Sequence, residues 1–259
     1  MEHTAHWLGG RVAVVTGASR GIGAAAAQAV AAAGAHVVLA ARDRDALGRV
    51  ADRIRDAGGQ ATAVPTDVSS EAEVGRLFAE ADRVARAGRG AKADRGAKAD
   101  RVGAVGALVC AAGVLTPAPF AETTTAMWDE TLGVNLTGTF LCCRAAFTAM
   151  AAAGQGRIVT IASLSGVYAT EKFPGLAAYN VSKYGVIGLT EAIAVEGKEH
   201  GISAVCLSPG AVDTEMLRRA NPALRPGLTP ADVAGLIVAL LDSPLAAASG
   251  ANIPLFSNA

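Results

Sequence analysis

The sequence has few residues that could bind a transition metal or join into disulfides. Among its 259 residues are four histidines and four cysteines. The histidines are scattered, and the cysteines lie in apolar stretches without metal-ligand spacing, at Cys110, Cys142, Cys143 and Cys206. We therefore predict free, buried thiols and no metal site.

The sequence also lacks an excess of charge of either sign. Lysine and arginine together number 23, as do aspartate and glutamate, so the formal net charge is zero. Proteins that bind nucleic acid or an anionic membrane usually carry an excess of positive charge. We expect neither partner for this chain.

Targeting signals are missing as well. The first residues contain neither the basic nor the apolar region of a signal peptide, so the cytoplasm is the expected location. Residues 24–41 are long and apolar enough to resemble a membrane span. Gly34 divides them into an alanine-rich part and a β-branched part, which favours a helix followed by a buried strand.

Apolar runs rich in β-branched residues recur along the chain and alternate with helical patterns. We predict strands at residues 11–16, 36–41, 61–66, 105–111, 157–163 and 202–207, with an edge strand at 251–256. With 51% hydrophobic residues the chain can build one sizeable core, so residues 1–259 are predicted to form a single domain. The predicted class is α/β, a doubly wound parallel sheet of about seven strands with helices on both faces.

A glycine-rich turn joins the first predicted strand to an alanine-rich helix. It reads Gly17-Ala18-Ser19-Arg20-Gly21-Ile22-Gly23. Glycines let the backbone approach an anion, and the free N–H groups at the helix start point at it. The turn predicts a Rossmann-type site for a dinucleotide, and the alternative is a tight structural turn.

The end of the second strand bears on the choice of cofactor. An acidic residue there binds a free ribose 2′-hydroxyl, whereas an arginine suits a 2′-phosphate. Arg42 follows this strand, and Arg20 could reach the same phosphate, which favours NADP(H). Two alternatives stay open: Arg42 is a solvated residue at a helix start, or Asp43 binds the ribose of NAD(H) after a slip of one residue.

Tyr179 and Lys183 are the strongest candidates for chemistry. A spacing of four puts them on one face of a helix, where the lysine charge would lower the tyrosine pKa and permit proton transfer. Such pairs also occur by chance on many helices.

Ser163 ends the fifth strand at the ligand-binding edge of the sheet, with Ser165 as the alternative hydroxyl. Asn135 is a polar residue in an apolar helix, where structural hydrogen bonds alone could explain it.

Two segments stand apart from the regular elements. Residues 86–102 contain a six-residue sequence repeated at once, at 89–94 and 95–100, which predicts an exposed, mobile loop or a frayed helix extension. Residues 213–228 are rich in arginine, proline and asparagine, which predicts a covering segment over the site. We expect this segment and residues 114–122 to set the substrate.

The order of these motifs resembles the short-chain dehydrogenase/reductase family in its shorter, classical form. The resemblance runs roughly from residue 11 to residue 255 and is nearest to 3-oxoacyl-[acyl-carrier-protein] reductase-like members. It rests on Thr16-Gly17-x-x-x-Gly21-x-Gly23, then Asp67-Val68, then Asn135, Ser163, Tyr179 and Lys183, and last Pro209-Gly210 with Val212 and Thr214.

The resemblance implies a role for each matched residue. Tyr179 would donate a proton to a carbonyl oxygen that Ser163 binds. Lys183 would lower the tyrosine pKa and hold the nicotinamide ribose, while Asn135 would hold a water. The implied cofactor contacts are Gly17, Ser19, Arg20, Gly21, Ile22, Gly23, Arg42, Asp67, Val68, Ala112, Gly113, Tyr179, Lys183, Pro209, Gly210, Val212 and Thr214.

The implied activity is that of an NADP(H)-dependent oxidoreductase interconverting a small-molecule ketone and a secondary alcohol. Reduction is the favoured direction, and a homotetramer or homodimer is expected. Two alternatives remain: an NAD-dependent alcohol dehydrogenase of the same family, and a non-catalytic cofactor-sensing or scaffold protein.

Three departures from the family pattern stand out. The usual Asn-Asn-Ala-Gly reads Cys110-Ala111-Ala112-Gly113 here, which removes an asparagine amide. The interval from Ser163 to Tyr179 is longer than usual, with residues 170–172 as the extra ones near the substrate mouth. The C-terminal residues lack the usual Asp-Gly-Gly, near the region where the family's tetramer packs.

Overall fold

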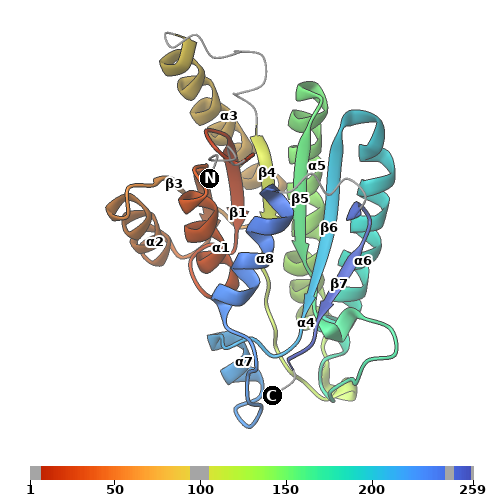
Figure 1. The fold of residues 1–259 in the computed structure, drawn as a ribbon. Coiled ribbons are helices and arrows are strands. Elements are labelled where there is room, and N and C mark those ends of the chain that lie inside the picture. Colours follow the sequence, from red (N-terminus) through yellow and green to blue (C-terminus); the bar gives the residue numbers. More distant parts are fainter. Residues whose placement is uncertain (1–6, 94–104, 243–247, 258–259) are drawn as a thin grey trace.

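The sheet has seven parallel strands in the order β3-β2-β1-β4-β5-β6-β7 (Figure 1). The structure is a computed structural model that describes residues 7–93, 105–242 and 248–257. The strands are β1 (Val12–Thr16), β2 (His36–Ala41), β3 (Gln60–Pro65), β4 (Val105–Cys110), β5 (Gly156–Ile161), β6 (Ile202–Pro209) and β7 (Asn252–Leu255). The strand order reverses between β1 and β4, and such a switch point opens a crevice at the carboxyl ends of the strands. The predicted parallel, doubly wound sheet is confirmed.

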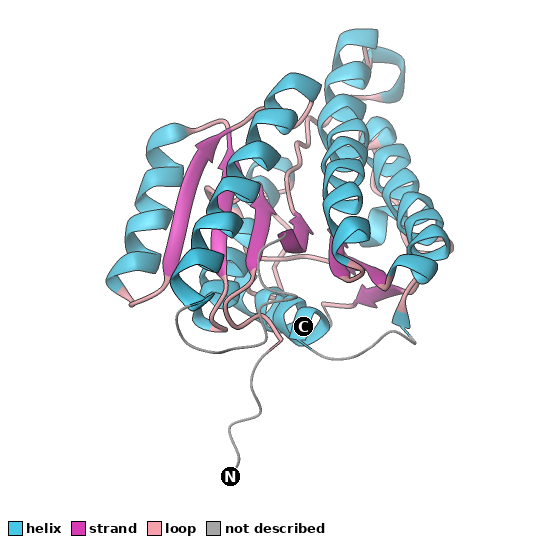
Figure 2. Cartoon of the chain, turned by 90° about the horizontal axis from the view of Figure 1, so that it is seen from above, coloured by secondary structure: helices cyan, strands magenta, loops and turns pink. Residues whose placement is uncertain are grey.

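Helices cover both faces of this sheet (Figure 2). They are α1 (Gly21–Ala32), α2 (Arg44–Asp56), α3 (Glu71–Ala93), α4 (Thr125–Leu132), α5 (Gly138–Ala153), α6 (Ala177–Gly197), α7 (Glu215–Ala220) and α8 (Pro230–Asp242). Because successive strand residues point to opposite faces, Val15 and Leu39 pack with α1, α2 and α8, whereas Val14 and Val38 pack with α3 and α5. Two apolar layers thus hold the strand ends in place around the crevice.

The stretch that resembled a membrane span is helix α1 followed by strand β2, as the sequence predicted. Within the described residues, another helical run, Thr125–Ala153, is long and apolar enough to cross a membrane by length and composition. This run contributes Leu141, Ala146 and Met150 to the core beside β4 and β5. Packing against the sheet therefore explains part of its apolar character, since 39% of the apolar window is buried.

The apolar helix in which the sequence placed Asn135 is interrupted. A five-residue π-helical segment, Gly133–Thr137, separates α4 from α5 and contains Asn135. Such single-turn π-helical segments are rare inside α-helices and are frequent at functional sites. Here the side chain of Asn135 bonds both to Val114 and to Ser182.

The repeated segment lies partly outside the described residues. Helix α3 continues to Ala93, so most of the first copy extends this helix, in line with one of the two predictions for residues 86–102. The second copy falls at residues 95–100, outside the described residues, as does the rest of the predicted mobile loop.

Candidate active site

A cavity of about 1430 Å³ opens at the carboxyl ends of the strands. This volume exceeds the roughly 300–1,000 Å³ of an ordinary small-molecule pocket, and it suits a dinucleotide with a second molecule beside it. Its lining includes these predicted residues: Gly17, Ser19, Arg20, Gly21, Ile22, Gly23, Arg42, Asp67, Val68, Ala112, Gly113, Ser163, Tyr179, Lys183, Pro209, Gly210, Val212 and Thr214. The alternative hydroxyl, Ser165, lines it too, whereas Asn135 does not.

The glycine turn has a shape that only glycine allows at two positions. Gly17 has φ +65°, and a Cβ there would lie 2.6 Å from the carbonyl oxygen of Ala111. A Cβ on Gly23 would lie 2.2 Å from the carbonyl oxygen of Gly17. These contacts bring β1, α1 and the end of β4 together, with the N-terminus of α1 at the cavity. The turn therefore fits the diphosphate of a dinucleotide, which this kind of helix start binds through backbone N–H groups.

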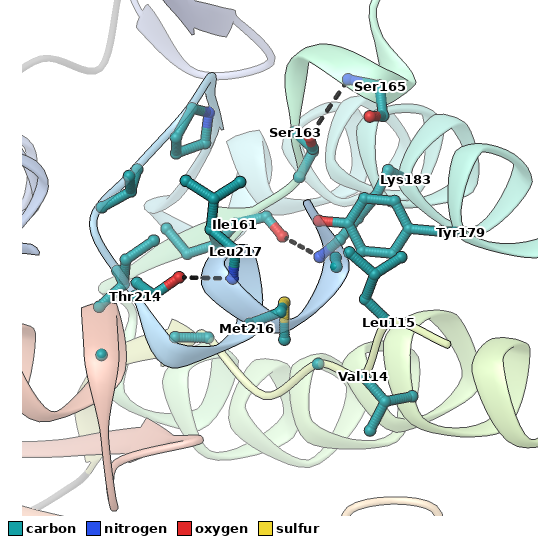
Figure 3. Close-up of a pocket in the computed structure, with 18 of the residues that line it drawn as sticks. Val114, Leu115, Ile161, Ser163, Ser165, Tyr179, Lys183, Thr214, Met216 and Leu217 are labelled. Carbon is teal, nitrogen blue, oxygen red and sulfur yellow. Dashed lines mark hydrogen bonds between the residues drawn. The ribbon is translucent and has the colours of Figure 1, made fainter. Parts of the chain in front are cut away.

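Ser163, Tyr179 and Lys183 meet on the opposite side of the cavity (Figure 3). The Nζ atom of Lys183 donates a 2.8 Å hydrogen bond to the carbonyl oxygen of Ile161 and lies 5.6 Å from the centroid of the Tyr179 ring. The hydroxyl group of Ser163 lies close enough to that of Tyr179 to act on the pKa of the tyrosine. Ser163 Oγ also accepts a 3.1 Å bond from the backbone N–H of Ser165, so Ser163, not Ser165, presents the hydroxyl beside the tyrosine.

The pKa shifts in this group differ from the sequence-based prediction. Burial raises the pKa of Tyr179, and the hydrogen bond with Ser163 opposes this only in part. Burial also lowers the pKa of Lys183, to about 8. The predicted lowering of the tyrosine pKa by Lys183 is therefore wrong for the protein without cofactor, because loss of hydration dominates both groups. A neutral phenol that keeps its proton is suited to donate it to a substrate oxygen.

Asn135 lies behind the cavity wall and is fully buried. Its Nδ2 donates to the carbonyl oxygen of Val114 at 3.0 Å and to Ser182 Oγ at 3.1 Å, while its Oδ1 accepts from the N–H of Val114 at 2.8 Å. Ser182 Oγ in turn donates to the carbonyl oxygen of Tyr179 at 2.7 Å. The side chain of Asn135 thus ties the loop after β4 to the helix that carries Tyr179.

Ser182 is a site residue that our sequence reasoning missed. It is fully buried and is the link between Asn135 and the backbone of Tyr179. Its position between Tyr179 and Lys183 was the available signal. A serine inside an apolar helix needs a hydrogen-bond partner, and a site residue one turn away is a natural one.

Charged residues gather at the end of the cavity formed by β1, β2 and β3. Arg20 forms a 3.0 Å ion pair with Glu215 of α7, and both side chains are largely exposed. The pKa of Asp67 is lowered chiefly by a hydrogen bond from Ser69, and the charge of Arg42 adds to this effect. Asp43 Oδ1 accepts a 2.9 Å bond from the N–H of Ala46 and caps α2. That bond gives Asp43 a structural role at the position where it could also face a ribose.

Ala111 lacks the asparagine amide that the family usually has at this position, and a hydrogen bond to Thr16 at the end of β1 compensates for it in part. The N–H of Ala112 donates a 3.2 Å bond to Thr16 Oγ1, so the backbone after β4 is held without the asparagine amide. A Cβ on Gly113 would lie 3.4 Å from Asn135 Oδ1 and 3.8 Å from Lys183 Nζ. The chain therefore runs close beside the lysine, where a flat ring or ribose has room to approach.

The family model described as short chain dehydrogenase matches residues 11–88 and 91–225. The chain therefore belongs to the short-chain dehydrogenase/reductase family, as its motif order suggested, and is an oxidoreductase of the kind that uses a nicotinamide cofactor.

Relatives with different names resemble the chain to a similar degree. The 3-oxoacyl-[acyl-carrier-protein] reductase of Synechocystis is 34% identical over 93% of this chain and 92% of the relative. The D-threitol dehydrogenase of Mycolicibacterium smegmatis is 35% identical over 82% of this chain and 74% of the relative. Identity at this level shows the family and leaves the substrate open.

Solved structures show the same fold. A short-chain type dehydrogenase/reductase from Mycobacterium marinum has a TM-score of 0.83 and 30% identity, covering 96% of this chain and 95% of the other. A structure from Beutenbergia cavernae with NADP bound at low occupancy has a TM-score of 0.81 and 36% identity, covering 96% of each chain.

Proposed function

We propose that this chain is an NADP(H)-dependent oxidoreductase that interconverts a ketone and a secondary alcohol, with reduction favoured. One observation carries the proposal: Ser163, Tyr179 and Lys183 meet in a single cavity with the glycine turn. A proton donor and a dinucleotide site that face one space are the two parts that carbonyl reduction requires.

The chain's own residues supply binding and the proton. The hydroxyl groups of Ser163 and Tyr179 would hold the substrate's carbonyl oxygen, and Tyr179 would donate its proton as negative charge develops there. Lys183, whose pKa of about 8 keeps it largely protonated at neutral pH, would stabilise the phenolate left behind. A bound nicotinamide would supply the hydride to the carbonyl carbon.

Tyr179→Phe tests this assignment. The variant should bind cofactor as tightly as the wild type while its carbonyl reduction falls by at least about 100-fold, in the range typical of a lost general acid. Unimpaired turnover in the variant would show that the mechanism is wrong. If the wild type binds cofactor but reduces no carbonyl in a broad panel, the scaffold alternative gains support.

The preference for NADP(H) rests on Arg20 and Arg42. Both line the cavity at the ends of β1 and β2, where a 2′-phosphate would lie. Fluorescence titration should show NADPH binding at least tenfold more tightly than NADH, which corresponds to about 1.4 kcal/mol. Tighter binding of NADH would instead favour the NAD-dependent alcohol dehydrogenase and assign the ribose to Asp43.

We also propose that the chain forms a homodimer or homotetramer and works in the reducing cytoplasm. Exposed apolar residues on α5 and α6, namely Phe140, Val181 and Val195, support self-association. All four cysteines are free thiols, which supports a reducing compartment. Sedimentation equilibrium of the purified protein tests the first proposal, and a monomer at micromolar concentration would contradict it.

A further inference from the structure

Apolar side chains surround the two hydroxyl groups that would hold a carbonyl oxygen. Leu115 from the loop after β4 and Met216 and Leu217 from α7 line the cavity around Ser163 and Tyr179 (Figure 3). None of these three side chains has an oxygen or nitrogen atom that could form a hydrogen bond with a hydroxyl-rich substrate. These three side chains therefore offer only van der Waals and hydrophobic contacts to a molecule held at Ser163 and Tyr179.

The apolar lining continues outward to the surface. Tyr168 and Phe173 from the loop before α6, and Phe256 after β7, also line the cavity, with 87%, 39% and 58% of their surfaces exposed. We call these six residues the substrate wall: Leu115, Tyr168, Phe173, Met216, Leu217 and Phe256. Large apolar side chains that gather at the opening of a cavity, exposed to water, commonly mark a ligand-binding groove.

The loop that carries Tyr168 and Phe173 is held by its own hydrogen bonds. The Nζ atom of Lys172 donates to the carbonyl oxygens of Leu164 at 3.2 Å and Val167 at 2.6 Å, and to Thr170 Oγ1 at 2.7 Å. The ammonium also lies 5.2 Å from the centroid of the Tyr184 ring. This loop contains the extra residues that sequence analysis placed near the substrate mouth, and Lys172 fastens it while its aromatic residues line the opening.

The charges beside the substrate wall do not favour an anionic substrate. Arg219 lines the cavity but is ion-paired with Glu215. Lys172 is bound to its own loop, as described above, whereas the carboxylate of Glu171 lines the cavity. A phosphate or carboxylate on the substrate would be repelled by the carboxylate of Glu171.

We propose that the substrates are neutral ketones and secondary alcohols that carry an apolar chain or ring, seated against the substrate wall. This inference rests on the proposed ketone–alcohol reaction and adds its substrate class. It disfavours polyols, because hydroxyl groups that face Leu115, Met216 and Leu217 would lose water without gaining partners there, and it disfavours substrates with a free carboxylate or phosphate.

The first test compares matched ketones with NADPH as the reductant. The value of kcat/KM should be at least tenfold higher for 2-octanone than for 2-butanone, because each fully buried methylene is worth about fourfold. Ethyl acetoacetate should likewise exceed acetoacetate, its anionic counterpart. Equal values for the two ketones, or a preference for dihydroxyacetone or acetoacetate, would overturn the proposal.

Variants then connect the preference to the wall. Phe173→Ala and Met216→Ala should each reduce the ratio of kcat/KM for 2-octanone over 2-butanone at least threefold. Leu236→Ala is the matched control, because Leu236 on α8 is 42% exposed, similar to Phe173, but does not line the cavity. A similar loss of selectivity in all three variants would contradict the assignment.

A binding measurement separates this inference from the proposed reaction. Calorimetric titration with 2-octanol should show binding that Met216→Ala weakens and Leu236→Ala leaves unchanged. If this binding is found but no ketone is reduced, the proposed reaction fails while the apolar wall stands as a ligand site. If 2-octanol does not bind and 2-octanone has no advantage, the wall has no such role.

Discussion

Replacing Lys183 by methionine should remove a pH dependence of stability that this buried amine imposes. Burial lowers the pKa of Lys183 from 10.5 to about 8. Between these two values the unfolded chain holds a proton that the folded protein has lost. The free energy of unfolding therefore rises with pH in this window, by about 1.4 kcal/mol per unit at most. Below pH 8 both states are protonated, and the cost of burying the charge is constant and largest.

The expected size follows from these two pKa values. From pH 7 to pH 9, Lys183 alone should raise the free energy of unfolding by about 1.3 kcal/mol. Burial raises the pKa of Cys142 and Cys206, which acts in the opposite direction because unfolded thiols lose their protons first. These cysteines remain in Lys183→Met, so the difference between wild type and variant reports Lys183 together with its electrostatic coupling to Cys206 and Cys110.

Urea denaturation at pH 7, 8 and 9, with a reductant and followed by circular dichroism, measures this difference. The stability of the wild type relative to Lys183→Met should increase by about 1.3 kcal/mol across the series. Lys198→Met is the control: Lys198 is exposed at the end of α6, and its variant should follow the wild-type curve. If the free energies of unfolding of wild type and Lys183→Met change equally with pH, the assignment of a buried amine with a lowered pKa is refuted.

Two further substitutions test the cofactor end of the cavity. Gly23→Ala would place a Cβ 2.2 Å from the carbonyl oxygen of Gly17, and it should cost about 1–3 kcal/mol in urea denaturation and weaken NADPH binding. Gly48→Ala in α2 is its control, since a Cβ there meets nothing within 4 Å, and a stability loss as large as that of Gly23→Ala would contradict the steric argument. Glu215→Gln should tighten NADPH about threefold without changing NADH, because it frees Arg20 from a weak exposed ion pair and removes a negative charge. Equal changes for both cofactors in fluorescence titration would show that Arg20 does not bind the 2′-phosphate.

Local patterns in the sequence were enough to predict most of the fold and which residues line the cavity. The β-branched runs, the glycine turn and the strand-helix alternation predicted the parallel sheet with its binding edge at the carboxyl ends. Because those ends share one edge, the turn at Gly17, Ser163 after β5 and the segment after β6 had to line one crevice. The helical spacing of Tyr179 and Lys183 likewise follows from chain geometry alone.

Tertiary structure decided the electrostatics of the same residues. The pKa of Tyr179 depends on whether lost hydration outweighs the charge of Lys183, and spacing along a helix does not give the depth of burial. The pairing of Arg20 with Glu215 joins residues 195 positions apart. The sequence around Arg20 and around Glu215 does not predict this contact. It forms only because α7 folds over the glycine turn.

The roles of Asn135 and the substrate wall were also settled by packing. The sequence marked Asn135 as a buried amide in need of partners but could not name Val114 and Ser182, because such bonds depend on the distance between separate elements. The six residues of the substrate wall come from four separate segments and share no motif. Sequence by itself thus determined the local elements and the sheet edge where they meet, whereas only the tertiary structure decided burial, hydrogen-bond partners and the character of the cavity wall.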